Sequence, residues 1–399
     1  MKFHASADGT DDALYEIPVL DGFSFSQSTN STEVTLNEAA DSSGNSKRGR
    51  AMFNDSFAPA EWSFSTYMRP SVSDSSDTYT IASGEGSHAG NAKKFAVEGP
   101  LWAAMSATTY NLGVGGTGAP TLASFEPNVF NFQNSNKVAL GVFDLFFVLG
   151  ASKDTDGTYT SGSGGVMIYK IEGCSIGSAS IDFDIEGIAQ VAWSGNGKLI
   201  TEQATLNTAA GQASTKGLIN EGISSTTNFI RQKLTDLAIA YDASESTGDT
   251  TGIGSSDITY SLTLTGGNIT IENNLTYLTP ESLGTVNQPL GHVMGTRSVS
   301  GNFTCYLNDV SNGSADLFEN LVESTGLITN AFALTFGIGG SGNTPSVDVA
   351  IPKAHLELPS HSIDDVIGIE VNFHGLSSDL SSATASSSAN EVSITYDAS

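Results

Sequence analysis

The chain has few charged residues, and few of those are basic. Charged side chains make up 15% of the 399 residues, against about 25% in an average soluble domain. Only 16 Lys and Arg stand against 43 Asp and Glu, which gives a formal net charge of −27. A surface that binds nucleic acid through its phosphates needs clustered basic residues, and the nearest approach is Lys47–Arg50. The composition argues against a protein that binds nucleic acid through its phosphates, and the excess of acidic residues repels DNA.

Cysteines and long apolar runs are also scarce. Cys174 and Cys305 make neither a disulfide framework nor a metal-binding spacing, which leaves two buried thiols or one disulfide as the alternatives. No run of about 18 apolar residues is present, so no membrane span is expected. The start, Met1–Ala5, has no apolar segment and predicts no signal peptide. The six histidines show no metal-binding spacing, and we expect neither a metal nor a cofactor.

In place of charge the chain is rich in Ser, Thr, Asn and Gly, which disfavour long helices and suit strands joined by turns. Apolar and polar residues alternate with a period of two over Ser180–Trp193, over Ile258–Thr265 and over Ile367–His374. Short helices are predicted only over Pro100–Ala107 and Ala315–Ser324. The fold class is therefore mainly β, of α+β type, with two short helices.

Similar segments occur in the same order in both halves of the chain. The matches are Phe64–Met68 with Phe303–Leu307, Gly99–Met105 with Ala315–Leu321, Val166–Lys170 with Val349–Lys353, and Ile181–Gly187 with Ile369–Gly375. An ordered repeat predicts a duplicated unit. The alternative is that alternating β sequences resemble one another by chance.

The repeat predicts two tandem domains, each a β-sandwich or partly closed barrel with one flanking helix. The first covers residues 1–200 and has longer loops at 71–91 and 113–136, which are rich in Ser and Gly. A linker rich in Gly, Ala, Thr and Asn covers 201–222, and the second domain covers 223–399.

One string matches a catalytic motif. Gly173-Cys174-Ser175-Ile176-Gly177 has the spacing of the nucleophile elbow of hydrolases, which needs a strand before it and a helix after it. A strand pattern follows instead of a helix. The string is therefore interpreted as a turn between two strands, and no catalytic residue is predicted.

The opening of the chain resembles the tail tube proteins of tailed bacteriophages, in particular those of marine phages. The resemblance is best over the first 110 residues and rests on Ile17–Phe25, on Thr35–Ala39 and, most specifically, on Phe53–Pro70, which contains Ala-Glu-Trp-Ser-Phe-Ser-Thr-Tyr. It implies β-sandwich units whose inner sheets join into a barrel around a lumen. A chain with two units resembles the tube proteins that form trimeric rings with pseudo-sixfold symmetry.

The resemblance also implies a role without catalysis. The rings stack into a tube that encloses a tape-measure protein, meets tail terminator and baseplate proteins, and conducts DNA as cargo. The protein would be assembled in the host cytoplasm and end in the virion. The alternatives are a virion decoration or receptor-binding protein, a polysaccharide hydrolase with paired carboxylates, and a surface-layer or adhesin fragment.

An acidic row is the only candidate site. Asp182, Asp184 and Glu186 alternate with apolar residues on one strand pattern, and Glu370 lies on the matching pattern of the second half. One interpretation is a solvated strand face. The other is an acidic lining of the lumen, or a face between subunits, where like charge keeps DNA from sticking.

Overall fold

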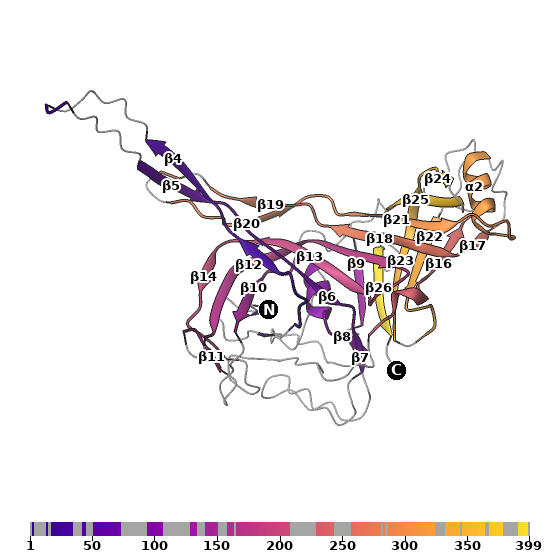
Figure 1. The fold of residues 1–399 in the computed structure, drawn as a ribbon, viewed down its shortest axis with the longest axis horizontal. Helices are drawn as coiled ribbons and strands as arrows, with labels where there is room; N and C mark the ends of the chain where they lie inside the picture. The colour runs from indigo at the N-terminus through magenta and orange to yellow at the C-terminus, as the bar shows by residue number, and fades with distance from the viewer. Residues whose placement is uncertain are drawn as a thin grey trace.

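The computed structural model of the chain describes residues 2–3, 13–14, 17–34, 42–44, 51–72, 94–106, 128–133, 140–150, 158–162, 165–207, 229–242, 257–280, 282–283, 286–323, 332–343, 345–363, 367–377 and 390–397. Strands dominate these residues (Figure 1), which confirms the mainly β class. The two α-helices are α1 (Gly99–Ser106) and α2 (Ser314–Glu323), each within one residue of its predicted place.

The strands of the first half are β1 (Lys2–Phe3), β2 (Ala13–Leu14), β3 (Ser24–Ser26), β4 (Thr29–Val34), β5 (Ala51–Phe57), β6 (Ala60–Tyr67), β7 (Pro70–Val72), β8 (Lys94–Ala96), β9 (Val129–Gln133), β10 (Phe143–Leu149), β11 (Thr158–Thr160), β12 (Met167–Asp184), β13 (Gln190–Gly197), β14 (Ile200–Glu202) and β15 (Thr205–Asn207). Those of the second half are β16 (Asp236–Tyr241), β17 (Ile258–Leu262), β18 (Leu264–Glu272), β19 (Leu275–Leu278), β20 (Gly291–Met294), β21 (Ser298–Tyr306), β22 (Phe332–Ile338), β23 (Ser346–Leu356), β24 (Ser360–Ile363), β25 (Ile367–Gly375) and β26 (Asn390–Asp397). One turn of 3₁₀ helix, η3, covers Gln232–Leu234.

One antiparallel sheet, here called the long sheet, runs through both halves. Its strands pair in the order β3, β6, β13, β12, β18, β21, β25, β24. The junction between the halves is the pairing of β12 with β18, which runs over seven residue pairs from Ser178–Glu272 to Asp184–Gly266. The long sheet is not closed on itself, and β3 and β24 are its two outer strands in the described part of the chain.

A second layer packs behind the long sheet in each half. In the first half the order is β2, β1, β10, β12 and β14, where β12 uses its first residues. In the second half the order is β17, β16, β22, β23, β26 and β9, so that β9 of the first half extends the layer of the second. The 18-residue strand β12 thus belongs to both layers, with Gly173 at φ +59° where it passes between them.

The turn after β12 corrects one sequence-based expectation. The alternation over Ser180–Trp193 predicted a single strand, but the chain reverses between Asp184 and Gln190. Gly187 has φ +118° there, a conformation that glycine adopts without strain. Phe183 before the turn and Ala189 and Val191 after it are all buried. The alternation of apolar and polar residues therefore continues through the turn in the sequence, although the strand ends there.

The halves share one hydrophobic core. At its centre the rings of Trp102 on α1 and Trp193 on β13 meet edge to face, with centroids 4.5 Å apart, an arrangement that contributes about 1 kcal/mol beyond burial. The indole N–H of Trp102 donates to the hydroxyl oxygen of Tyr396 on β26, at 2.7 Å. The helix of the first half is therefore tied to the last strand of the second.

A buried polar cluster makes a further link between the halves. The Asn273 amide, after β18, donates to the carbonyl oxygens of Met105 at 3.2 Å and Ile176 at 3.1 Å. Its oxygen accepts from Nε of Arg297 at 3.0 Å, and Nη1 of Arg297 lies 3.3 Å from Glu391 on β26. Buried polar groups are tolerated where partners satisfy them, so these bonds specify how the halves meet.

Part of the predicted linker is ordered strand. Residues 201–202 and 205–207 of the predicted 201–222 belong to β14 and β15, which pair with β12 and β11, so they pack with the first half. The rest of that stretch, from 208, lies outside the described residues, as do 73–91 of the first predicted loop and 113–127 and 134–136 of the second. Residues 129–133 of the second loop form β9. Cys174 and Cys305 are free and buried, as the first alternative required.

One of the four sequence matches joins strands that differ in position. Phe64 lies on β6 and Phe303 on β21, and both strands occupy the long sheet next to a hairpin. Ile181, however, lies on β12, while Ile369 lies on β25. β25 pairs with β21 as β13 pairs with β6, so β13 is the positional counterpart of β25. Short alternating strands share one pattern, which allowed the wrong strand to match.

Candidate functional site

The long sheet has one buried face and one polar face. On β12, β18 and β21 the residues Ile181, Ile269 and Phe303 point into the core and are at most 1% exposed. The alternate residues form the other face, here called the polar face. It carries Glu61, Ser63, Ser65, Ser180, Asp182, Asp184, Gln190, Ser194, Asn268, Thr270, Glu272, Ser300, Asn302, Thr304, Glu370, Asn372 and His374. Strand alternation, which turns every second side chain outward, creates this face.

A row of carboxamide and carboxylate side chains crosses four strands of the polar face. Asp182 lies opposite Asn268, Asn268 opposite Asn302, and Asn302 opposite Asn372. The Asn302 amide donates to Oε1 of Glu370 at 2.9 Å, and Oδ1 of Asn268 accepts from the Asn302 backbone N–H at 3.2 Å. Such cross-strand bonds hold the side chains in place on the sheet.

The structure brings three of the four predicted acidic residues onto this face. Asp182, Asp184 and Glu370 are exposed there, and Glu186 lies in the turn between β12 and β13. Sequence analysis missed Glu61 and Glu272, although the alternation in β6 and β18 would have revealed both. These acids face solvent beside Ser, Thr and Asn. Across the described strands of the long sheet, none of the residues on the polar face is Lys or Arg.

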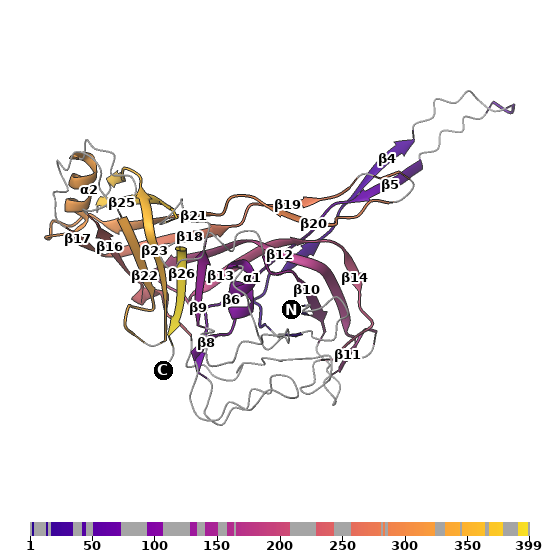
Figure 2. The same ribbon diagram turned by 180° about the vertical axis from the view of Figure 1, so that it is seen from behind.

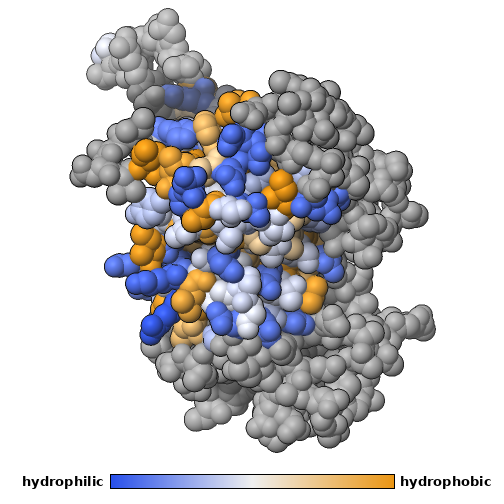
Figure 3. Space-filling view, turned by 90° about the vertical axis from the view of Figure 1, so that its right-hand side faces the viewer, coloured by the Kyte–Doolittle hydropathy of each residue, from blue (hydrophilic) through white to orange (hydrophobic). Residues whose placement is uncertain are grey.

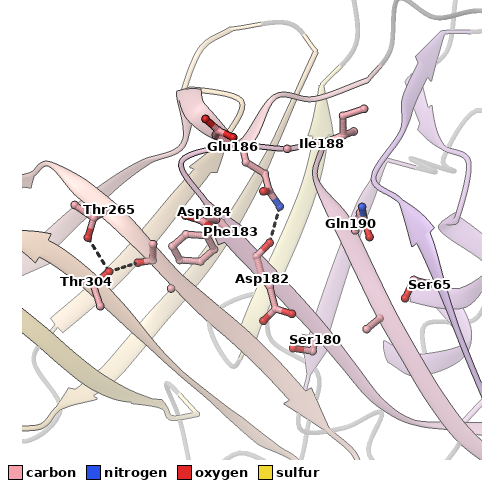
Figure 4. Close-up of a pocket in the computed structure, with 15 residues that line it drawn as sticks. Ser65, Ser180, Asp182, Phe183, Asp184, Glu186, Ile188, Gln190, Thr265 and Thr304 are labelled. Atoms are coloured by element: carbon pink, nitrogen blue, oxygen red, sulfur yellow. Dashed lines mark hydrogen bonds between the residues drawn. The ribbon is translucent and has the colours of Figure 1, made fainter. Parts of the chain in front are cut away.

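A shallow hollow of about 640 Å³ opens on the polar face where the two halves join (Figure 4). Asp182, Asp184 and Glu186 line it from one side, and Thr265 and Thr304 line it from the other. The side-chain amide of Gln232, on η3, donates to the backbone carbonyl of Asp182 at 2.7 Å and closes one end. Among the described residues no group of three or more His, Cys, Asp or Glu could hold a metal.

The two ends of the long sheet expose apolar side chains around an outer strand. Beside β24 lie Tyr306, Leu307, Val310, Val322 and Ile367, each at least 36% exposed, and Figure 3 shows this end with apolar side chains among polar ones. Near β3, at the other end, Val19 and Phe23 are exposed. An outer strand with unpaired backbone groups and apolar neighbours is a template for another chain.

The two helices differ in how they are covered. All eight residues of α1 are buried, because the second half of the chain packs over the helix through Asn273 and Tyr396. On α2, Leu317 is buried but Val322 is 52% exposed. Among the described residues, α2 therefore exposes an apolar side chain at the outer end of the molecule, whereas α1 exposes none.

Two hairpins project from the body (Figures 1 and 2). The first, β4–β5, joins β3 to β6, and its two strands (residues 29–34 and 51–57) are here called arm 1. The second, β19–β20, joins β18 to β21, and its described residues (275–280, 282–283 and 286–294) are here called arm 2. Both extend in the same direction and lie side by side, and each leaves the long sheet between two strands that pair with one another.

The catalytic string of the sequence forms an anchor for arm 2. Gly173–Gly177 lies within β12, so its interpretation as a turn was wrong. Oγ of Ser175 is 3.1 Å from Nδ1 of His292 on β20, but Ser175 is fully buried and no substrate can reach it. Burial and the nearby Lys198 lower the pKa of His292, which keeps the ring neutral. The hydroxyl of Tyr277 donates to the carbonyl oxygens of Gly173 and Asn196, each at 2.9 Å.

The similarity of the whole chain to a known protein decides the family. The chain is 32% identical over 372 residues to the tail tube protein pb6 of Escherichia phage T5, in an alignment that covers 92% of this chain and 68% of pb6. It belongs to the tail tube proteins of tailed bacteriophages. No family model matches the chain. This tail tube protein is a structural component of the phage tail. No helix among its described residues is long and apolar enough to cross a membrane.

Proposed function

We propose that three copies of this tail tube protein close into a ring of six tube units, and that the rings stack into the tube. Each half of the chain is one unit, as the sequence repeat predicts. The observation that carries the proposal is the β12–β18 pairing, which already joins two units edge to edge within one chain. A heterologous contact of the same kind between chains closes a ring when the rotation allows it.

The internal junction supplies the register of the contact between chains. The residue numbers of Phe64 and Phe303 differ by 239, and the same offset relates Glu61 to Ser300 and Ser65 to Thr304. Ser26 pairs with Glu61 on β6 as Thr270 pairs with Ser300 on β21, so β3 takes the place of β18.

The other side of the junction follows in the same way. Ser360 pairs with Glu370 on β25 as Ser180 pairs with Ala192 on β13, so β24 takes the place of the second part of β12. Within the chain, Ser180 lies opposite Thr270. Between chains, we expect Ser360 of one copy to lie opposite Ser26 of the next. The uncovered side of α2 then meets the next copy, as α1 meets the second half.

In this ring the polar face lines the lumen, because the opposite face packs in the core of each unit. Its acids, Glu61, Asp182, Asp184, Glu272 and Glu370, then point toward whatever passes through the tube. Like charge keeps DNA from binding to the wall over distances of about 10 Å at 0.1 M salt. The tube encloses the tape-measure protein during assembly in the host cell and conducts DNA at infection. Terminator and baseplate proteins cap its ends.

Cysteine cross-linking tests the ring. In the double variant Ser26→Cys/Ser360→Cys, oxidation is expected to link chains covalently into a species that closes at three copies on a non-reducing gel. Both native thiols are buried, so they do not compete. The matched control is Ser24→Cys/Ser360→Cys, which shifts one thiol by two residues, or about 7 Å along the strand, and is expected to cross-link poorly. Chains that stay monomeric, or ladders that close at six, would contradict the proposal.

A further inference from the structure

A histidine lies at the outer edge of the long sheet, where the proposed ring contact forms. His361 on β24 pairs with Ile369 on β25, and Ile369 is 3% exposed, so both side chains lie on the core side of the sheet. The ring of His361 packs edge to face on Phe318 of α2, with centroids 4.3 Å apart, and α2 lies beside β24 in Figure 1. His361 is nevertheless exposed, because β24 is an outer strand in the described part of the chain.

The junction within the chain shows what this position becomes once another strand covers it. Because β24 takes the place of the second part of β12, with Ser360 at the position of Ser180, His361 stands where Ile181 stands. Ile181 lies opposite Ile269 of β18, and these two side chains are 1% and 0% exposed. At the internal junction the position is therefore part of the hydrophobic core.

Phe25 is the side chain that lies opposite His361 in the proposed ring, because β3 takes the place of β18 in the register given above. Phe25 pairs with Trp62, which is 2% exposed, so it too is on the core side of its sheet. Its ring centroid lies 4.7 Å from that of Phe147 and 5.4 Å from that of Tyr169. The surface that His361 meets on the next copy is thus built from aromatic rings.

Acidic groups lie near His361 without pairing with it in the described part of the chain. Glu370 on β25 belongs to the polar face, on the opposite side of the sheet. On α2, Asp316 accepts a backbone N–H just before the helix at 2.7 Å, and Glu319 is exposed. Residues 364–365, both Asp, lie outside the described residues. Among the described residues, no carboxylate forms an ion pair that would offset a proton on the His361 ring.

We infer that the contact between copies buries a neutral His361 between Phe318 of its own chain and Phe25 of the next copy, and that protonation of His361 opens this contact. The inference rests on the proposed ring and adds control of its closure by pH. An imidazolium that leaves water for an apolar site loses its hydration, and a cation–π contact with the rings recovers only part of that cost. The internal junction, which has isoleucines at these positions, stays closed.

The direction of the pH dependence follows from this burial. An exposed histidine takes up a proton below about pH 6.5, whereas one buried among apolar groups stays neutral to lower pH. The association constant of each contact is therefore full at pH 7.5 and about tenfold lower at pH 5.5. The 43 Asp and Glu act in the opposite direction, since their protonation weakens the repulsion between copies as the pH falls. Comparison of two proteins at each pH separates the two effects.

His361→Ile copies the internal junction into the contact between copies and tests the inference. Light scattering over a concentration series measures the association constant of the unaltered chain and of the variant at pH 7.5 and pH 5.5. The constant of the variant relative to that of the unaltered chain is expected to rise about tenfold per contact between these two pH values. His374→Ile makes the same substitution at an exposed histidine of the polar face, and its relative constant is expected to stay the same.

A fixed charge at the same position gives a second test. His361→Lys is expected to fold as the unaltered chain does, as judged by circular dichroism, because position 361 is exposed in the single chain. It is expected to stay monomeric at both pH values. Rings of His361→Lys in normal yield would overturn the inference.

The inference and the ring fail in different ways. If the unaltered chain and His361→Ile form three-chain rings whose association constants change equally with pH, His361 does not control the contact, and the inference falls while the ring stands. If neither protein forms three-chain rings at either pH, the proposed ring falls and the inference falls with it.

Discussion

The hydroxyl of Tyr396 lies between two partners from the first half of the chain: it accepts a hydrogen bond from Trp102 at 2.7 Å and donates one to the carboxylate of Glu98. Trp102 and Tyr396 are fully buried, and Glu98 is almost fully buried. Glu98 also accepts from the backbone N–H of Arg69, at 3.3 Å to each oxygen. The last strand of the protein is therefore held through a carboxyl group inside the core.

This carboxyl predicts a dependence of stability on pH. Burial raises the pKa of Glu98 from 4.5 to about 7, although the bonds from Tyr396 and Arg69 favour the ionised form. The folded chain then keeps a proton that the unfolded chain releases above pH 4.5. The contribution to stability is full below that pH and is lost as the pH rises to about 7, by about 3 kcal/mol.

Urea denaturation between pH 4.5 and 8 measures this contribution. Glu98→Gln keeps the hydrogen-bonding shape without the charge, so its free energy of unfolding is expected to fall less steeply with pH than that of the unaltered chain. Glu370→Gln, on the exposed polar face, controls for the loss of one acid from a chain of charge −27. Equal slopes for the unaltered chain and Glu98→Gln would contradict the prediction.

The Arg297–Glu391 pair predicts a large effect from breaking one side. The Arg297 side chain has no exposed surface and Glu391 is its carboxylate partner at 3.3 Å. Glu391→Ala leaves the guanidinium charge buried without that partner, and we expect a loss of about 3–5 kcal/mol in the free energy of unfolding. Adding Arg297→Met should recover much of the loss, whereas a double variant no more stable than Glu391→Ala would count against this role for the charge.

The polar face predicts a graded response to charge. Asp182 and Asp184 are exposed and can be changed with little effect on folding. Assembled tubes of Asp182→Asn/Asp184→Asn, and more strongly of Asp182→Lys/Asp184→Lys, are expected to retain short duplex DNA, and retention should fall steeply with salt. Fluorescence anisotropy of labelled DNA measures this. If tubes of the unaltered chain and of both variants all fail to retain DNA, Asp182 and Asp184 do not line the lumen.

The anchor of arm 2 predicts local loosening without global unfolding. Tyr277→Phe removes the donor to two carbonyls, a net change of about 1–2 kcal/mol. Hydrogen exchange in residues 275–294 should become faster, while exchange in β6 and β13 should not change. Tyr306→Phe, at a hydroxyl on the exposed end of β21, is the matched control. Unchanged exchange in arm 2 would mean that other contacts hold it.

Sequence patterns predicted the local parts of this fold and missed its long-range parts. The period of two identified which side chains of β12 and β25 face outward, and the two helices were placed within one residue. Periodicity carries no information on which strands pair, so the β12–β18 junction and the β9–β26 pairing could not be foreseen. For the same reason Ile181 was matched to Ile369 although their strands differ in position.

The candidate site was predicted in composition but not in extent. Asp182, Asp184 and Glu370 were recognised as outward-facing acids, whereas Glu61 and Glu272 join them only because β6 and β18 lie in the same sheet. Glu98 carried no signal at all. It precedes α1 in a position that looks like an exposed helix start, yet it is 1% exposed and bonded to Arg69 and to Tyr396 on β26.

The junction of β12 with β18 also bears on how fast a ring can form. Joining two units in one chain makes three of the six edge contacts in the proposed ring intramolecular, where the partner strand is present at a high effective concentration. Three molecules must then meet instead of six, so less translational freedom is lost. The rate of nucleation should depend on a lower power of protein concentration than it would for single-unit subunits, which favours tube growth while the protein is still scarce.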